Sequence, residues 1–274
     1  MEAKFNRLKD IIKEMGSLLV AFSGGVDSSF LLKVASDILG NRVVAVTAAS
    51  PTYPSREIES AKEIAGLLGV KHILITSNEL DIPGFSSNPT NRCYFCKNEL
   101  FQKLKEKASE LGLNHVADGS NYDDTKDFRP GRDAARELGI RSPLIETGLT
   151  KNEIRSLAKK LSLPNWDKPS FACLSSRFPY GTEITPMRLR QVENCENIIR
   201  EMGFRQFRVR YHNEVARIEV GRDELQRFYD NKIWDNIING FKANGFVYIT
   251  LDLEGYRTGS MNQPLLIGGE SHAN

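Results

Sequence analysis

The segment SGGVDSS, residues 23–29, combines small, hydroxyl and acidic side chains in a spacing that suits phosphate binding. It follows an apolar run and opens a helical pattern, so its backbone N–H groups are expected at a helix N-terminus, where the helix dipole favours an anion. The glycines allow close approach of the backbone, and the hydroxyl groups add donors. The carboxylate cannot favour phosphate directly, so its expected role is to bind Mg²⁺ or to shape the loop. The predicted binding residues of this loop are Ser23, Gly24, Gly25, Asp27 and Ser28.

This loop differs from two common nucleotide-binding motifs. No Lys-Ser/Thr pair follows the glycines, as a Walker A motif requires, and the spacing GxGxxG of dinucleotide-binding folds is absent. An ordinary glycine-rich turn with a Ser or Asp helix cap is the alternative explanation.

A second polar loop, DGSNYDD at 118–124, follows a later apolar run. In open α/β sheets, ligands bind at the carboxyl ends of the strands. Asn121 and Asp124 are therefore predicted to assist the binding of a nucleotide or of Mg²⁺. A polar loop with Asx turns is the structural alternative.

Three cysteines indicate metal or sulfur chemistry. The segment RCYFCK places Cys93 and Cys96 three residues apart, and Cys173 lies in a later irregular stretch. A CxxC by itself can be half of a zinc site, a redox pair, two cluster ligands or two buried residues. Three thiolates can hold three irons of a [4Fe-4S] cluster and leave one iron open, whereas structural zinc prefers four ligands. Cys195 is interpreted as a buried helix cysteine; if it were a ligand, zinc would be favoured.

A basic strand is the third chemical feature. The pattern FRVRYH at 207–212 places Arg208 and Arg210 on the same face of a strand. Two guanidinium groups on one face can bind a phosphate or a carboxylate, but a solvated basic edge that discourages aggregation explains the pattern equally well. Arg177 lies close after the third cysteine, and Glu196 lies on the helix predicted before the strand.

Alternating apolar patterns in the first 165 residues predict the elements that position these groups. Helices are expected at 4–15, 28–39, 55–68, 94–111, 131–138 and 150–161. Ser55 is the expected N-cap of the third helix, and Thr150 with Glu153 forms the spacing of a capping box. Strands are expected at 17–22, 42–48, 72–76, 114–118 and 142–146. Five strands separated by helices predict a parallel α/β sheet with helices on both faces.

The pattern changes after this region. Residues 164–183 are rich in Pro, Ser and Gly and have no period. They are followed by a small α+β domain, expected to contain an antiparallel sheet, with helices at 185–202 and 222–239 and strands at 207–212, 215–220 and 246–252. The expected domains are 1–168, a cysteine-bearing connector at 169–183, and 184–274.

Length and composition exclude several classes of protein. The chain has 274 residues, 40% hydrophobic and 26% charged, which is ordinary for a globular protein of about two domains. No apolar run approaches the roughly 18 to 20 residues that span a bilayer, and no targeting segment is apparent, so a cytoplasmic protein is expected. The net charge of +2 gives no general argument for binding nucleic acid. Four cysteines are too few for a disulfide framework.

The motifs taken together resemble a known family. SGGVDSS resembles the PP-loop of the ATP-pyrophosphatases, and DGSNYDD resembles their Gly-x-Asn-x-Asp-Asp loop. Over nearly the whole chain, the sequence is similar to the LarE family, the ATP-dependent pyridinium-3,5-biscarboxylic acid mononucleotide sulfurtransferases. The further segments that carry this resemblance are DFRPG (127–131), NWDK (165–168), SSRFPYGT (175–182), RVRYHNEVARIE (208–219) and YITLDLEGYRTGSMN (248–262).

The resemblance implies a reaction and its cofactors. ATP with Mg²⁺ adenylylates a carboxylate of the substrate nucleotide, and a sulfur nucleophile displaces AMP to leave a thiocarboxylate, in the biosynthesis of the nickel-pincer nucleotide of lactate racemase. Some members sacrifice a cysteine of the SSR loop; others hold a [4Fe-4S] cluster with three cysteines. The presence of Cys93 and Cys96 matches the cluster type. The family's tendency to assemble through its second domain implies a homo-oligomer.

The resemblance also implies residue roles. Those expected to bind the cluster are Cys93, Cys96 and Cys173. Those expected at the catalytic centre are Cys173, Arg177 and Glu196. Those expected to bind phosphate or carboxylate of the substrate are Lys97, Arg208 and Arg210.

Three other functions compete with this one. A PP-loop tRNA thiolase also combines SGGxDS with three cysteines, but it needs an extended basic face to follow phosphates. A PP-loop synthetase that uses ammonia would not need three cysteines. A zinc-stabilised nucleotide sensor without catalytic activity would bind one zinc instead of iron and sulfide.

Overall fold

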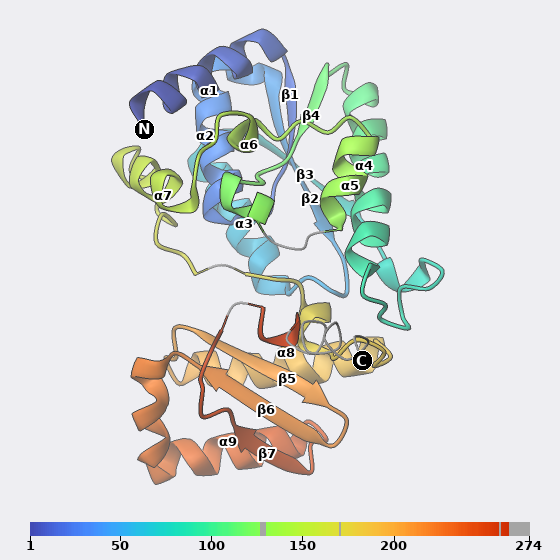
Figure 1. Cartoon of the computed structure of the whole chain (residues 1–274), viewed down its shortest axis with the longest axis vertical. Coiled ribbons are helices and arrows are strands. Elements are labelled where there is room, and N and C mark those ends of the chain that lie inside the picture. Colours follow the sequence, from blue (N-terminus) through green and yellow to red (C-terminus); the bar gives the residue numbers. More distant parts are fainter. Residues whose placement is uncertain (127–129, 170, 258, 263–274) are drawn as a thin grey trace, which may run out of the picture. The chain divides into compact units, whose positions relative to one another are not determined.

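The chain divides into two compact units (Figure 1). The computed structural model describes residues 1–126, 130–169, 171–257 and 259–262. Unit 1 comprises Met1–Phe85 and Thr90–Phe171, and unit 2 comprises Ser86–Pro89 with the residues from Ala172 onward. Three residues of the DFRPG motif, 127–129, lie outside the described residues.

A parallel sheet of four strands forms the centre of unit 1, in the order β3-β2-β1-β4. Successive side chains of a strand point to opposite faces. Leu18 and Val20 therefore pack into one core of buried residues, and Leu19 packs into the other. The strands are β1 (Leu18–Ala21), β2 (Val43–Ala49), β3 (Lys71–Thr76) and β4 (His115–Ala117).

Helices cover both faces of this sheet, as predicted (Figure 1). The first core takes side chains from α1 (Glu2–Met15), α2 (Val26–Leu39), α3 (Ser55–Leu67), α6 (Pro143–Glu146) and α7 (Lys151–Lys160). The second takes side chains from α4 (Arg92–Glu110) and α5 (Gly131–Glu137). Short 3-10 helices lie at η1 (Gly40–Arg42), η2 (Glu79–Asp81) and η3 (Tyr122–Lys126).

The fifth strand predicted at 142–146 is wrong. Pro143–Glu146 forms the short helix α6, and a single parallel bridge between Ala117 and Arg141 marks where a strand would have begun. Proline has no N–H to donate to a neighbouring strand, and its fixed φ suits the first turn of a helix. The apolar side chains of this helix are still used for packing: Pro143 and Leu144 are buried, and Leu144 belongs to the first core.

Of the two helix caps predicted from the sequence, the structure confirms one and contradicts the other. Thr150 and Glu153 form the predicted capping box: the Thr150 hydroxyl accepts from the Glu153 N–H, and the Glu153 carboxylate accepts from the Thr150 N–H at 2.9 Å. The expected N-cap Ser55 is wrong, because Ser55 is the first residue of α3 and Pro54 occupies the cap position. The side chain of proline has no hydrogen-bond acceptor, so Pro54 makes no capping bond to a backbone N–H of the helix.

Replacing Glu153 by Gln is expected to lower the melting temperature at pH 7 by about 2–4 °C. Hydrogen bonds from the Lys4 ammonium and the Thr150 N–H lower the pKa of Glu153 to about 2 from its ordinary value of 4.5. A carboxylate whose pKa is depressed on folding stabilises the protein above its unfolded pKa, and this contribution is lost as pH falls through the folded pKa. Thermal melts of both proteins from pH 7 to pH 2 test this, and a difference that does not shrink below pH 4.5 contradicts it.

Unit 2 is built on a mixed sheet of three strands in the order β5-β6-β7. The expectation of a wholly antiparallel sheet is wrong: β5 and β6 are antiparallel, but β6 and β7 are parallel. A crossover through η5 (Arg222–Tyr229) and α9 (Asn231–Ala243) separates β6 from β7, and such a connection returns the chain in the same direction. The strands are β5 (Phe207–His212), β6 (Val215–Val220) and β7 (Tyr248–Leu251), and the remaining helices are η4 (Leu174–Arg177), α8 (Pro186–Glu201) and η6 (Ser260–Asn262).

The helix predicted at 222–239 is divided in two. Asp230 separates the 3-10 helix η5 from α9 and caps α9, because its carboxylate accepts from the N–H of Lys232 at 2.9 Å. Asp is among the preferred N-cap residues, so this division has a local cause.

The second part of the irregular stretch 164–183, from Ala172 onward, belongs to unit 2. Asn88 from the short segment Ser86–Pro89 donates its side-chain amide to the carbonyls of Phe178 and Pro179, at 3.3 and 2.7 Å. The N–H of Gly181 donates back to the carbonyl of Asn88 at 3.0 Å. These bonds give the residues around Arg177 a defined backbone. Across the described ranges, no helix is both long and apolar enough to cross a membrane.

Candidate active site

Hydrogen bonds among its own residues hold the SGGVDSS loop at the N-terminus of α2. The Ser28 hydroxyl donates to the carbonyl of Gly25 at 3.1 Å and lies 3.1 Å from the hydroxyl of Ser23. Gly24 has a φ of +66°, and a Cβ there would lie 3.0 Å from the Cα of Ala61. This turn therefore requires glycine. The turn leads directly into α2, and the backbone N–H groups at the start of a helix can bind an anion.

The second polar loop meets the first one. Strand β4 lies beside β1, and a Cβ on Gly119 would lie 2.8 Å from the Ser28 nitrogen. The side-chain amide of Asn121 donates to Asp27 at 3.4 Å, and the Asp124 carboxylate accepts from the Asn121 N–H at 3.0 Å. Helices leave β1 and β4 toward opposite faces of the sheet, which makes this the position where α/β sheets bind ligands. The structure thus brings together the two loops that the sequence singled out.

Asp27 has the features of a ligand for Mg²⁺. One of its carboxylate oxygens, Oδ2, contacts Lys151 and Asn121, whereas Oδ1 is buried and has no hydrogen-bond partner among the described residues. Burial raises the pKa of Asp27, the nearby Asp124 raises it further, and Lys151 lowers it. A buried carboxylate oxygen without a partner is costly unless a cation or a donor completes it. The residues present therefore fit Mg²⁺ bound together with the phosphates of ATP.

Three residues that the sequence did not predict as site residues also hold the loop. Asn165 donates its side-chain amide to the carbonyl of Gly24 at 3.0 Å and to the hydroxyl of Ser29 at 2.9 Å. The Tyr53 hydroxyl donates to the carbonyl of Ser23 at 2.6 Å. Lys151 is the third, through its ion pair with Asp27. Asn165 belongs to the NWDK segment, but no local pattern indicated the other two.

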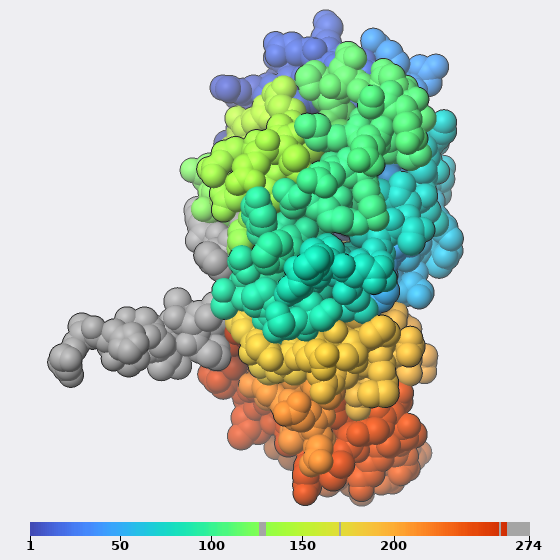
Figure 2. Space-filling model, turned by 90° about the vertical axis from the view of Figure 1, so that its right-hand side faces the viewer, coloured from blue at the N-terminus to red at the C-terminus, as the bar shows by residue number. Residues whose placement is uncertain are grey.

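Two of the three candidate cluster ligands lie together on unit 1. Cys93 and Cys96 occupy the first turns of α4, a helix at the surface of this unit (Figure 2). Residues three apart share a helix face, so both thiols lie on one side, with Cys93 exposed and Cys96 half-buried. Lys97 follows them, with its ammonium 5.2 Å from the centre of the Phe101 ring.

Cys173 lies on unit 2, directly before η4. Its carbonyl accepts hydrogen bonds from the Ser176 N–H and hydroxyl and from the Arg177 guanidinium, and its side chain is half-buried. Within either unit, the described residues gather no group of three Cys, His, Asp or Glu side chains able to hold a metal ion. The shared cluster of Cys93, Cys96 and Cys173 stays a prediction.

Cys195 is fully buried in α8. Burial, and to a smaller extent the negative charge of Glu196, raises the pKa of the Cys195 thiol to about 12. A thiol with so high a pKa stays protonated near neutrality, and metals bind thiolates. This agrees with the interpretation of Cys195 as a packed helix residue.

Arg177 and Glu196 form a buried ion pair in unit 2. The two nitrogens Nε and Nη2 of Arg177 donate to the two carboxylate oxygens of Glu196 at 2.8 and 3.0 Å, and the side chains are 0% and 1% exposed. Although burial raises the pKa of Glu196, the charge and hydrogen bonds of Arg177 outweigh it and lower that pKa overall. The Val209 N–H also donates to Glu196, at 3.1 Å. Glu196 therefore joins the SSRFPYGT segment, α8 and β5.

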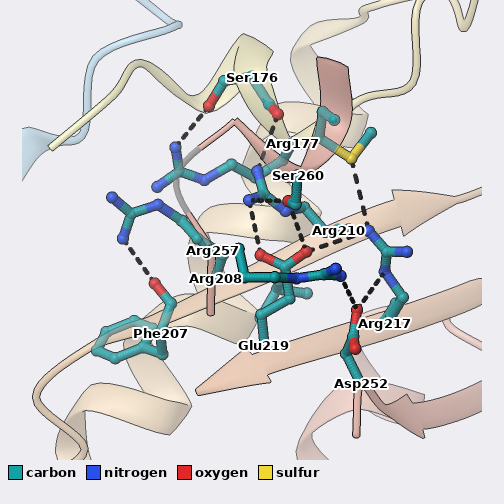
Figure 3. A network of polar contacts seen from close by, with 12 residues as sticks. Ser176, Arg177, Phe207, Arg208, Arg210, Arg217, Glu219, Asp252, Arg257 and Ser260 are labelled. Atoms are coloured by element: carbon teal, nitrogen blue, oxygen red, sulfur yellow. Dashed lines mark hydrogen bonds and ion pairs between the residues drawn. The ribbon is translucent and has the colours of Figure 1, made fainter. Parts of the chain in front are cut away.

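The predicted basic strand carries a concentrated positive charge (Figure 3). Arg210 donates to Glu219 at 2.7 Å and to the Ser260 hydroxyl at 3.0 Å, yet its buried Nε finds no acceptor among the described residues. The guanidinium of Arg208 lies 5.1 Å from the Tyr256 ring centre. Burial, followed by the like charge of Arg177, lowers the pKa of Arg208 to about 10. A bound anion would offset the repulsion between these guanidinium groups, because a nearby negative charge stabilises the charged form of arginine.

Comparisons with known proteins agree with this arrangement. A family model described as asparagine synthase matches residues 12–84, which include β1, the loop and α2. The chain is 45% identical over 265 residues to an uncharacterized protein of Synechocystis sp., covering 97% of this chain and 99% of that protein. It is 29% identical over 198 residues to a tRNA-specific 2-thiouridylase of Caldanaerobacter subterraneus, covering 55% of this chain and 52% of that protein.

A further relative covers both units. The pyridinium-3,5-bisthiocarboxylic acid mononucleotide synthase of Lactiplantibacillus plantarum is 38% identical over 255 residues, 93% of this chain and 92% of that protein. With its phosphate loop at the end of β1 and its arginine-rich second unit, the chain belongs to the LarE family of PP-loop sulfurtransferases.

Proposed function

We propose that this chain uses ATP to convert carboxylates of pyridinium-3,5-biscarboxylic acid mononucleotide to thiocarboxylates, in the biosynthesis of the nickel-pincer nucleotide. The observation that carries the proposal is the 38% identity to the synthase of Lactiplantibacillus plantarum over 93% of this chain. The joined loops around Asp27 support the ATP-dependent half of the reaction, and the crowded arginines of unit 2 support an anionic substrate.

The first step activates the substrate. A carboxylate oxygen attacks the α-phosphorus of ATP, the bond to the bridging oxygen breaks, and pyrophosphate leaves with the electron pair. Carboxylates are poor electrophiles, and the acyl-adenylate supplies AMP as a leaving group. Backbone N–H groups of the loop and the dipole of α2 stabilise the pyrophosphate. The residues that would bind Mg²⁺-ATP are Ser23, Gly24, Gly25, Asp27, Ser28, Asn121 and Asp124.

The second step replaces AMP by sulfur. A sulfur nucleophile adds to the acyl carbon, the bond to AMP breaks, and a thiocarboxylate and AMP remain. Arg208 and Arg210, with Lys97 of unit 1, would bind the phosphate or the second carboxylate of the substrate. In this proposal Glu196 acts in the site by holding Arg177, because both of its oxygens are already engaged.

The proposed source of sulfur rests on the cysteines. The paired thiols of Cys93 and Cys96 on one face of α4 suit two ligands of a [4Fe-4S] cluster, and Cys173 would be the third. With three ligands from the protein, such a cluster supplies an open iron that can carry sulfide. Thiolates are the usual ligands of these clusters, so the donor set fits the group.

Anaerobically purified protein is expected to contain about four irons and four sulfides per chain and to thiolate the nucleotide when ATP is added. Replacing Cys93 by Ser is expected to remove most of the iron and the thiolation activity, while ATP still binds to the loop. Cys195→Ala is the matched control, because Cys195 is a buried thiol and should leave the iron content unchanged. Iron and sulfide analysis, isothermal titration with ATP, and mass spectrometry of the product provide the measurements.

Three outcomes would contradict parts of this proposal. One zinc per chain in place of iron would overturn the cluster. ATP-dependent thiolation of unmodified tRNA, with none of the mononucleotide, would favour the function named for the 29% identical thiouridylase. The net charge of +2 weighs against that function. Incorporation of ammonia instead of sulfide would indicate an amidating synthetase.

A further inference from the structure

Lys151 pairs with one oxygen of the Asp27 carboxylate, beside the oxygen that would bind a metal ion. Its ammonium forms an ion pair with Asp27 Oδ2, and both side chains are largely buried, with 25% and 19% of their surfaces exposed. Asp27 Oδ1, beside it, is buried and lacks a partner among the described residues. A protein cation therefore pairs with one oxygen of the carboxylate, and nothing in the described part of the chain pairs with the other.

The backbone of Lys151 is held at the start of α7, whereas its side chain is a four-carbon stem with rotatable bonds. Lys151 is the first residue of α7, directly after the N-cap Thr150, and its N–H donates to the Asp123 carboxylate at 2.9 Å. Helix α7 packs into the first core through Ile154 and Leu157. Rotation about the bonds of this side chain can therefore move the ammonium to another partner while the backbone stays in place.

The carboxylates near Lys151 determine how its ammonium would respond to Mg²⁺. Asp27, Asp123 and Asp124 gather near Lys151, and a divalent cation on Asp27 would repel the ammonium from the same carboxylate. The displaced ammonium needs another anion. The phosphates expected at the N-terminus of α2 are the nearest anions that the proposed reaction supplies.

We infer that Lys151 is a catalytic residue that exchanges partners: it neutralises Asp27 in the free protein and moves to the phosphates when Mg²⁺ and ATP bind. This inference rests on the proposed function for the identity of the reaction. As the carboxylate oxygen bonds to the α-phosphorus and the bridging bond breaks, negative charge grows on the pyrophosphate. Lys151 donates hydrogen bonds to it and transfers no proton.

Partner exchange predicts opposite effects on metal binding and on turnover. In Lys151→Ala, the competing cation is gone, so Mn²⁺, used as a probe for Mg²⁺, is expected to bind the ATP-free protein about tenfold more tightly. Turnover is expected to fall about 10²-fold, since one charged donor to the leaving group is lost. Lys151→Arg retains the charge and is expected to bind Mn²⁺ as the unaltered protein does and to recover part of the turnover.

Electron paramagnetic resonance titration with Mn²⁺, without ATP, and a pyrophosphate-release assay measure the two effects. Lys33→Ala is the control, because Lys33 pairs with Asp37 on the outer face of α2 and lies outside the loop. Mn²⁺ affinity in Lys151→Ala that is unchanged or weaker would overturn the inference, as a purely structural lysine would give that result. Lys151→Gln serves in the same way if the alanine variant does not fold.

The two proposals fail separately. If the unaltered protein forms no thiolated nucleotide but Lys151→Ala binds Mn²⁺ more tightly and releases pyrophosphate more slowly with another acceptor, the inference stands and the proposed substrate is wrong. If the unaltered protein thiolates the nucleotide and Lys151→Ala behaves like Lys33→Ala in both assays, the proposed function stands and the partner exchange is wrong.

Discussion

Replacing Asp27 by Asn is expected to lower ATP-dependent pyrophosphate release by about 10³-fold, because the charge that holds Mg²⁺ beside the phosphates is lost. The carboxamide has the shape of the carboxylate and can still accept a hydrogen bond from Lys151. The loop should therefore keep its conformation, including the contact of Asn121 with this side chain.

The same change is expected to leave the melting temperature unchanged or to raise it. Burial raises the pKa of Asp27, which means that the folded protein disfavours its charge. Removing a charge that is retained for function commonly stabilises a protein. Asp37→Asn is the control, since Asp37 lies on the same helix and is about half exposed. Wild-type pyrophosphate release by Asp27→Asn would show that this carboxylate binds no essential metal.

Breaking the buried Arg177–Glu196 pair of unit 2 is expected to have a large effect on stability. Arg177→Met leaves the carboxylate of Glu196 buried without its main partner, which is expected to lower the free energy of unfolding by about 3–5 kcal/mol. The loss arises because Glu196 is 1% exposed and would keep the Val209 N–H as a donor but lose both hydrogen bonds from the guanidinium. The double variant Arg177→Met with Glu196→Gln removes both charges and is expected to regain part of this loss.

Urea denaturation of the full chain measures the change in unit 2. A Trp166→Phe background leaves Trp234 of α9 as the fluorescent reporter, because the chain has two tryptophans. Glu183→Gln is the control: its ion pair with Arg188 is 3.6 Å long and its side chain is 66% exposed, so a change below about 0.5 kcal/mol is expected. A similarly small change in Arg177→Met would show that the buried pair does not support the fold.

Several predictions that depend on residues close together in the chain were confirmed, whereas two that depend on distant residues were wrong. Strands β5 and β6 have the predicted limits, and the capping box of α7 formed, because alternation and capping depend on residues close in the chain. The fifth strand failed because apolar composition by itself does not distinguish a short strand from a short buried helix. The direction of β7 depends on a crossover that local patterns do not specify.

The sequence by itself determined that a small-residue loop with a carboxylate joins a buried strand to a helix, since this depends on residues within a few positions of each other. Only the tertiary structure decided what surrounds that loop. Lys151 and Asn165 reach it from 124 and 141 residues away, and Arg177 meets Glu196 within a closed core. These pairings arise because packing excludes water and leaves each buried polar group to find its partner among whatever the fold brings near.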